Sequence, residues 1–145
     1  MTSAQITAPP TPSKLELIRR FMAASGIQSQ IDSGSMLDRF MVPGSPVFNA
    51  ALGEETTFLQ AVNAASDALH AVYAKHRSVW QEEYESHINW EFTEVELEEI
   101  VGFLERPVGQ HFLEGRWRMD AYIGTNTEQL MEEIMREAEA VLLSS

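Results

Sequence analysis

The stretch FTEVELEEIVGFLERPVGQHFL, residues 92–113, decides the fold because it joins two helical patterns at a proline. Thr93 followed by Glu96 is a capping box: the Thr93 hydroxyl accepts from the amide of Glu96, and the Glu96 carboxylate accepts from the amide of Thr93. Phe92 and Leu97 form the matching hydrophobic staple. Glutamates crowd the first turns, where the helix dipole stabilises negative charge. The pattern predicts a helix that begins after Thr93 and ends before the proline.

The proline marks an elbow between that helix and the next. Pro107 pushes Arg106 out of the α region and suits the first position of a new helix. Gly109 has no Cβ, so a neighbouring helix can approach it closely. We therefore predict a structural elbow formed by Phe103, Pro107, Gly109 and Gln110. The joining of two helices explains each of these residues without a substrate.

The same stretch resembles the signature of a bacterial family catalogued as domain of unknown function 2059. In that family an acidic helix capped by Thr or Ser leads to an aromatic residue, then to Ser-Pro-x-Gly-Gln and an apolar pair. The matching positions here are Phe103, Pro107, Gly109 and Gln110, with Leu104 where the family often has Tyr and Arg106 where it often has Ser. The segment WQEEYESHINWEFT and, more weakly, LELIRRFMAASGIQSQID extend the similarity. The resemblance implies a small all-helical protein, usually exported to the periplasm or cell envelope, with no established activity or catalytic residue.

Helical spacing of apolar residues continues through the rest of the chain. Thr11 is the predicted N-cap and Pro12 the first residue of a helix that Gly26 stops. A second helix is predicted to reach Met41, with a loop at residues 42–46. Two further helices follow, a long one from Glu54 to Ile88, with a break near residues 76–80 as an alternative, and a last one capped by Thr125 with Glu128. The predicted fold is all-α, a single compact bundle of about six or seven helices over residues 12–145, after a flexible Pro-rich segment at 1–11.

Composition excludes several classes of function. The chain has 145 residues and a net charge of -12, so it lacks the clustered Lys and Arg that nucleic acid requires. It has no cysteine, which removes disulfides and thiolate chemistry. The sequence contains no run of eighteen apolar residues, so no transmembrane segment is predicted. The start, MTSAQITAPPTPSK, lacks the features of a signal peptide, so either the protein is cytoplasmic or the signal has been removed. The resemblance and the Pro-rich start favour the processed, exported form.

No catalytic or metal-binding pattern emerges. The four histidines, His70, His76, His87 and His111, lack the spacing of a zinc pair, and Asp67-Ala-Leu-His70 has no second copy to complete a di-iron site. No serine lies in a nucleophile elbow and no glycines form a phosphate loop. The sequence predicts no catalytic residue, metal or cofactor. A hydrolase-type enzyme with a carboxylate and histidine site is the weaker alternative.

Two aromatic groups are candidate binding residues. Trp80, Tyr84 and Phe92, with Ile88, either line a groove for an apolar ligand or partner, or form core, and core is favoured. Arg116, Trp117 and Arg118 either form an exposed interface hot spot, or Trp117 packs inward with Phe112 or Ile123 while the arginines pair with glutamates. Inward packing is favoured. The last helix, ending in AVLL, is the element best suited to self-association.

The predicted function is accordingly non-enzymatic, by binding of a protein or an apolar ligand in the cell envelope. The predicted partners are an envelope protein or a second copy of the chain. A structural homodimer without a ligand is the alternative.

Overall fold

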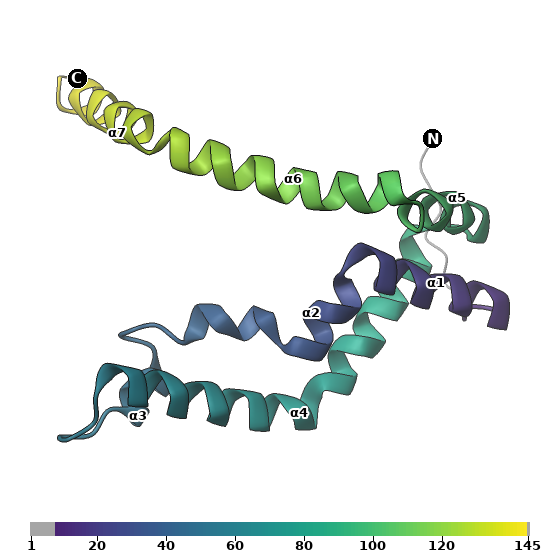
Figure 1. Cartoon of the computed structure of the whole chain (residues 1–145), viewed down its shortest axis with the longest axis horizontal. Coiled ribbons are helices and arrows are strands. Elements are labelled where there is room, and N and C mark those ends of the chain that lie inside the picture. Colours follow the sequence, from purple (N-terminus) through teal and green to yellow (C-terminus); the bar gives the residue numbers. More distant parts are fainter. Residues whose placement is uncertain (1–7, 145) are drawn as a thin grey trace. The chain divides into compact units, whose positions relative to one another are not determined.

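The structure, a computed structural model, describes residues 8–144, and every regular element within them is a helix (Figure 1). The elements in chain order are α1 (Pro12–Ser25), α2 (Ile27–Ser33), the 3-10 helix η1 (Ser35–Phe40), α3 (Pro46–Ala51), α4 (Phe58–Glu91), α5 (Glu94–Leu104), α6 (Pro107–Asn126) and α7 (Glu128–Leu143). The predicted all-α class is confirmed. The predicted elbow also lies where expected, between α5 and α6.

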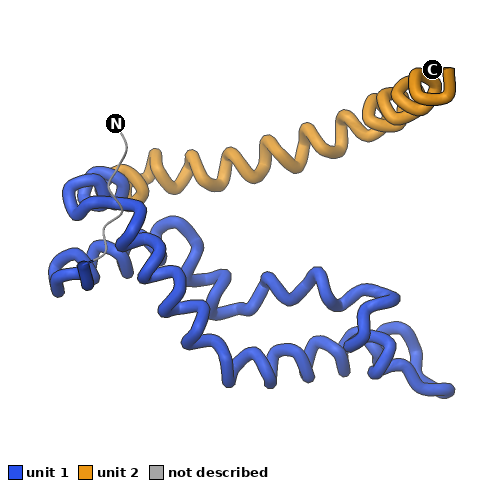
Figure 2. Tube along the Cα trace, turned by 180° about the vertical axis from the view of Figure 1, so that it is seen from behind, with its two compact units in different colours: residues 1–102 blue, residues 103–145 orange. Residues whose placement is uncertain are grey.

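The contacts of the chain group into two units, Met1–Gly102 and Phe103–Ser145 (Figure 2). The sequence had predicted one domain over residues 12–145. The physical reason for the difference is burial: Gly109 is the one buried residue of α6, and α7 has none. The large apolar side chains of these two helices therefore form no buried core. Each unit is described below by itself.

The first helix begins and ends at the predicted residues. The Thr11 hydroxyl accepts from the amide of Lys14 at 3.2 Å, and Pro12 is the first helical residue. Gly26 ends α1 with a φ of 89°, a left-handed conformation that an L side chain rarely adopts. Residues 8–11, part of the segment predicted to be flexible, are held in place at Ala8, whose carbonyl accepts from the side-chain amide of Asn89 at 2.9 Å. The rest of that segment, residues 1–7, lies outside the described residues.

The second predicted helix is wrong in its length. It ends at Ser33 instead of reaching Met41, because Gly34 takes a φ of 66° and the chain continues as the 3-10 helix η1. A Cβ on Gly34 would lie 3.1 Å from Cδ1 of Tyr73, so the turn also needs the small residue for space. The Tyr73 hydroxyl donates to the carbonyl of Ile31 at 2.6 Å. A side chain from α4 thus fixes the turn, which local spacing alone does not reveal.

The long helix α4 starts later than predicted and has no break. It begins at Phe58, not Glu54, because Thr57 and Gln60 form a capping box that the sequence reading missed. It then runs unbroken for 34 residues, past the alternative break at residues 76–80. The short helix α3 was also missed, although Ser45 accepts from the amide of Phe48 at 3.1 Å and caps it. In both cases the capping residues, Thr57 with Gln60 for α4 and Ser45 for α3, could have been recognised from the sequence.

The main core of the first unit lies where α1, α2, α4 and α5 meet. Its buried members are Leu17, Ile18, Met22, Ile31, Ile88 and Leu97. Lys14 is buried beside them, and its Nζ donates to the carbonyl of Asn89 at 3.0 Å in the last turn of α4. Burial lowers the pKa of Lys14, while Glu94 and Glu96 act in the opposite direction. The lysine is a C-terminal cap for α4, a role that suits a cation at that end of the helix dipole.

Replacing Tyr73 with Phe should cost about 1–2 kcal/mol at neutral pH, because the buried carbonyl of Ile31 loses its donor. Burial, and to a smaller extent Tyr84, raise the pKa of Tyr73 above its ordinary value of 10.0. As pH rises through 10, the unfolded chain therefore loses the Tyr73 proton while the folded chain keeps it, and the parent protein loses stability. Tyr73→Phe removes that loss. Urea denaturation of both proteins from neutral to alkaline pH should show the stability gap shrinking as pH rises, and a constant gap would contradict the prediction.

The elbow is built by residues on both sides of Pro107. The side-chain amide of Gln110 donates to the carbonyl of Leu104 at 2.6 Å and so caps the end of α5. The rings of Phe103 and Phe112 pack with their centroids 6.0 Å apart. A Cβ on Gly109 would lie 2.0 Å from the carbonyl oxygen of Phe103, so the predicted close approach is confirmed. The approaching backbone is the end of α5 itself.

The boundary between α6 and α7 differs from the predicted one. α6 continues through Thr125 to Asn126, so the last helix does not begin after Thr125. The predicted cap Thr125 instead donates its hydroxyl to the carbonyl of Ala121 at 3.1 Å, within the helix. α7 begins at Glu128, after Thr127. A helical Ser or Thr that bonds back to the preceding turn competes with the capping geometry, which explains the error.

Candidate functional site

The most distinctive surface of the described residues is the apolar face of α7. No residue of this helix is buried. Its large apolar side chains are 48% to 78% exposed; they are Leu130, Met131, Ile134, Met135, Val141, Leu142 and Leu143. At helical spacing all but the last share one side, while Glu128, Glu132, Glu133, Glu137 and Glu139 occupy the remainder. α7 is therefore a strongly amphipathic helix whose apolar side contacts water.

A narrower apolar stripe runs along α6. Val108, Phe112, Gly115, Met119 and Tyr122 follow one another at steps of four, three, four and three residues, the spacing of a coiled-coil seam. The four large side chains of this stripe are 52% to 69% exposed. In Figure 1, α7 runs on from the end of α6 and does not fold back along it. Neither helix covers the stripe of the other.

In the Arg116–Trp117–Arg118 cluster on α6, the two arginines flank that stripe and Trp117 lies on the opposite side of the helix. Trp117 is 57% exposed, so the favoured inward packing is wrong for the chain as described. Phe112 and Ile123, the proposed packing partners, are themselves more than half exposed. The arginines pair along the helix, Arg116 with Asp120 at 3.9 Å and Arg118 with Glu114 at 3.8 Å. A small hollow of about 210 Å³ lies beside the indole, lined by Phe112, Leu113, Arg116, Trp117 and Asp120.

Replacing Trp117 with Ala should change the free energy of unfolding by less than about 1 kcal/mol, because the exposed indole leaves no closed cavity. A core tryptophan would cost about 3–5 kcal/mol. Thermal and urea denaturation of dilute protein measure the difference directly. Leu113→Ala, on the neighbouring turn, is a control for the loss of apolar surface. A loss of several kcal/mol for Trp117→Ala would show that the indole is covered after all.

The second aromatic group is core, as favoured. Trp80, Tyr84 and Phe92 are partly buried and pack against the main core, and Ile88 is one of its buried members. The ring of Trp80 also meets that of Tyr73 edge-on, with centroids 5.3 Å apart. Trp80, Tyr84 and Phe92 do not line a single groove. Tyr84 and Phe92 border a shallow hollow at the end of α4, while Trp80 borders a different one.

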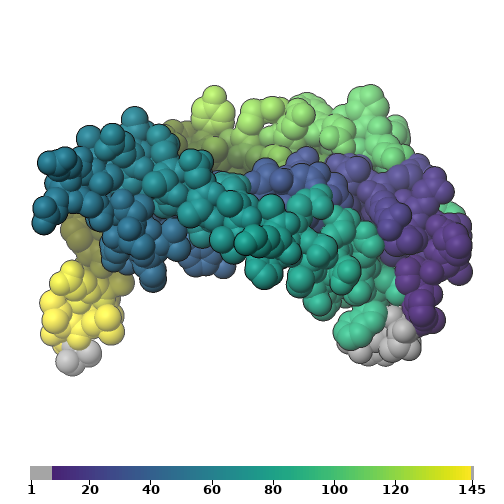
Figure 3. Space-filling model, turned by 90° about the horizontal axis from the view of Figure 1, so that it is seen from below, coloured from purple at the N-terminus to yellow at the C-terminus, as the bar shows by residue number. Residues whose placement is uncertain are grey.

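The hollow at Trp80 is an apolar groove on α4 that was not predicted from the sequence. Its volume is about 310 Å³, and it is lined by Leu37, Leu69, Val72, Tyr73, His76, Val79 and Trp80. Val72 and Val79 are 53% and 52% exposed. The residues of α3 and α4, blue to teal, form a continuous band across the face of the first unit seen in Figure 3. The helical spacing of Leu69, Val72, His76 and Val79 was visible in the sequence, but spacing does not say whether a face is covered.

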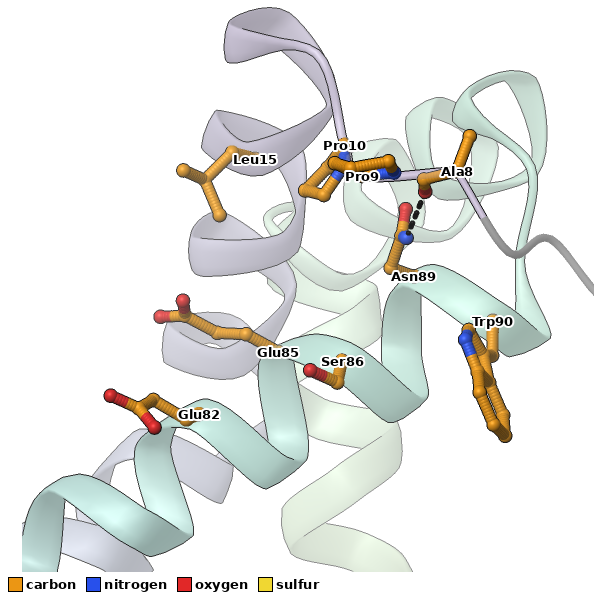
Figure 4. A pocket seen from close by; sticks show the side chains of 9 residues that line it. All are labelled: Ala8, Pro9, Pro10, Leu15, Glu82, Glu85, Ser86, Asn89 and Trp90. Carbon is orange, nitrogen blue, oxygen red and sulfur yellow. Dashed lines mark hydrogen bonds between the residues drawn. The ribbon is translucent and has the colours of Figure 1, made fainter.

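A larger cleft of about 410 Å³ lies between residues 8–10, α1 and α4 (Figure 4). Of its two carboxylates, Glu82 and Glu85, the second is engaged with Arg19 at 3.5 Å and with the side-chain amide of Gln81 at 2.8 Å. Asn89 donates to Ala8 across the cleft, and the Trp90 ring points away from the other lining side chains. The Asn89 side chain holds the N-terminal segment against α4, and the polar groups of the cleft do not converge on a common point. The cleft therefore offers no catalytic arrangement.

Residues 8–144 contain no cluster of ionisable side chains with the arrangement of a metal site. No three His, Asp or Glu side chains in that range are placed to hold a metal ion. His70 bonds to the Ser66 carbonyl at 2.8 Å, His87 lies 3.5 Å from Glu83, and His76 borders the apolar groove. Among the described helices, none has the length and apolar character needed to cross a membrane.

No family model matches the sequence, and no relative was found among curated proteins or solved structures. The resemblance of residues 92–113 to domain of unknown function 2059 stays a prediction. The structure explains those residues as the capping box of α5 and the elbow before α6.

Proposed function

We propose that this protein is a non-enzymatic binding protein that associates with another protein through the apolar faces of α6 and α7. The observation that carries the proposal is an amphipathic helix without a buried residue: α7 has an apolar side, and every large side chain on it is exposed. Exposed apolar surface of this extent costs free energy in water, and in soluble proteins it usually marks a contact surface. Helix faces read by residues three and four apart are a common form of protein recognition.

The remaining features are consistent with this proposal. The polar groups of the cleft between α1 and α4 do not converge on a common point, and the Arg116–Trp117–Arg118 cluster has the composition of an interface hot spot. The cell envelope is the proposed compartment, on the basis of the family resemblance of residues 92–113. Fractionation of tagged protein in its native cells tests that part separately: recovery in the cytoplasmic fraction would contradict it.

Photo-crosslinking in the native cells tests association directly. A photo-reactive amino acid placed at Met135, on the apolar side of α7, should crosslink to a protein partner. The same amino acid at Glu133, on the charged side, is the matched control and should not. Ile134→Asp should abolish the Met135 crosslink while circular dichroism shows that the rest of the chain stays helical. Equal crosslinking from both positions, or none from Met135, would refute the proposal.

A further inference from the structure

We infer that the partner is a second copy of this chain, with α6 of each copy lying antiparallel against α7 of the other. The inference rests on the proposed function, because it names the occupant of the same two faces. Three features of the described residues support it: the charges beside each stripe, the apolar area available, and the closure of the pairing.

The charges beside the α6 stripe favour an acidic partner. Arg116 and Arg118 flank the seam on opposite sides. Arg116 lies one turn before Met119, and Arg118 lies beside it. Their ion pairs within α6 are at 3.8 Å or more, and the side chains involved are 58% to 66% exposed, so these pairs are weak. Two α6 stripes packed together would bring arginine near arginine. α6 is therefore a poor partner for itself.

α7 supplies the opposite charge. Five of its residues are acidic and one, Arg136, is basic. Met131, Met135 and Leu142 form a line along the apolar side of α7, and Glu132 and Glu139 flank this line. The two glutamates hold the same heptad position in α7 that Arg116 holds in α6. In an antiparallel pair of helices, equivalent flanking positions face one another, so Arg116 of one copy meets Glu132 or Glu139 of the other. Two α7 helices packed together would oppose glutamates, which leaves α6 against α7 as the complementary pairing.

The available area is that of a stable dimer. Nine large side chains contribute from each copy, four on the α6 stripe and five on α7; they are Val108, Phe112, Met119, Tyr122, Met131, Ile134, Met135, Val141 and Leu142. At about 60–100 Å² each, they supply roughly 500–900 Å² per copy. A stable interface buries about 800 Å² per partner.

The pairing also closes on itself. Each copy presents one α6 and one α7, so the same contact is made twice around a two-fold axis and no stripe is left over. A foreign helix would cover one of the two stripes and leave the other in water. The chain carries both halves of the complementary pair, which is the reason for choosing a second copy over a different protein.

Charge reversal tests this pairing in purified full-length protein. Sedimentation equilibrium should show the parent protein as a dimer whose dissociation constant rises with salt. Arg116→Glu, and separately the pair Glu132→Lys with Glu139→Lys, should each raise that constant about tenfold, because two attractions per dimer become repulsions. The pair Glu133→Lys with Glu137→Lys makes the same change in net charge on the outer side of α7 and should have little effect.

Mixing the two interface variants is the decisive step. In the mixed dimer, the glutamate that replaces Arg116 in one copy lies opposite the lysines introduced in the other. At the second contact, the native Arg116 lies opposite the native glutamates. Attraction is restored at both contacts, so equal amounts of the two variants should associate nearly as tightly as the parent.

Three results would overturn the inference. The first is a parent protein that stays monomeric at high micromolar concentration, and the second is a pair of variants that mix without recovery. The third is a set of stability changes that do not depend on concentration, because these would show that α6 and α7 pair within one chain. A monomer that still crosslinks to a foreign protein from Met135 would sink this inference and leave the proposed function standing.

Discussion

Replacing Gly109 with Ala is expected to destabilise the fold by about 3 kcal/mol, although alanine normally stabilises a helix. The Cβ would lie 2.0 Å from the carbonyl oxygen of Phe103 and 2.8 Å from Cα of Leu104. Both are backbone atoms at the end of α5, so neither can move without opening the elbow. The donation from Gln110 to the Leu104 carbonyl would be lost in the same movement.

Two other glycines, Gly102 in α5 and Gly124 in α6, have open space around them and are the matched controls. A Cβ on Gly102 or Gly124 meets nothing within 4 Å. Ala at either position should raise the free energy of unfolding by about 0.5–1 kcal/mol, because glycine loses more backbone entropy on folding. Urea denaturation of the three variants provides the comparison. A Gly109→Ala protein as stable as Gly102→Ala would refute the close approach.

Replacing Ile18 with Ala should cost about 2–5 kcal/mol, the second large effect. Ile18 is 0% exposed and lies in the main core beside Met22 and Leu97. Removing three of its carbons leaves a cavity that closely packed neighbours fill only partly. Leu59→Ala is the control: Leu59 is 66% exposed on α4 and should cost less than about 0.5 kcal/mol. Similar losses for the two variants would mean that the core lies elsewhere.

Local capping residues and helix-ending residues explain how much of the fold the sequence predicts. Thr11, Gly26, Thr93 and Pro107 act through atoms within a few residues of themselves, so the ends they mark are readable from the chain alone. The predicted length of the second helix was wrong because its end at Gly34 depends on the ring of Tyr73, about forty residues away. That contact exists only after α4 has packed.

The candidate site was predictable in part. Periodicity places the apolar side chains of α7 on one face, and the sequence identified this helix as suited to association. Periodicity does not say whether another element covers that face, and so Trp117 was assigned to the interior and the α4 groove was not predicted. Exposure is a property of packing, and only the structure shows that Val72, Trp117 and Met135 contact solvent.

Amide hydrogen exchange along α7 tests the central claim, that its apolar face is a contact surface left uncovered by its own chain. A lone helix of 16 residues is only marginally stable in water, so in dilute purified protein the α7 amides should exchange far faster than those of α1 and the middle of α4. Raising the protein concentration should slow exchange in α6 and α7 and leave α1 and α4 unchanged. If the α7 amides are as protected as those of α4 in dilute protein, and their protection does not change with concentration, the face is covered within one chain and the claim is contradicted.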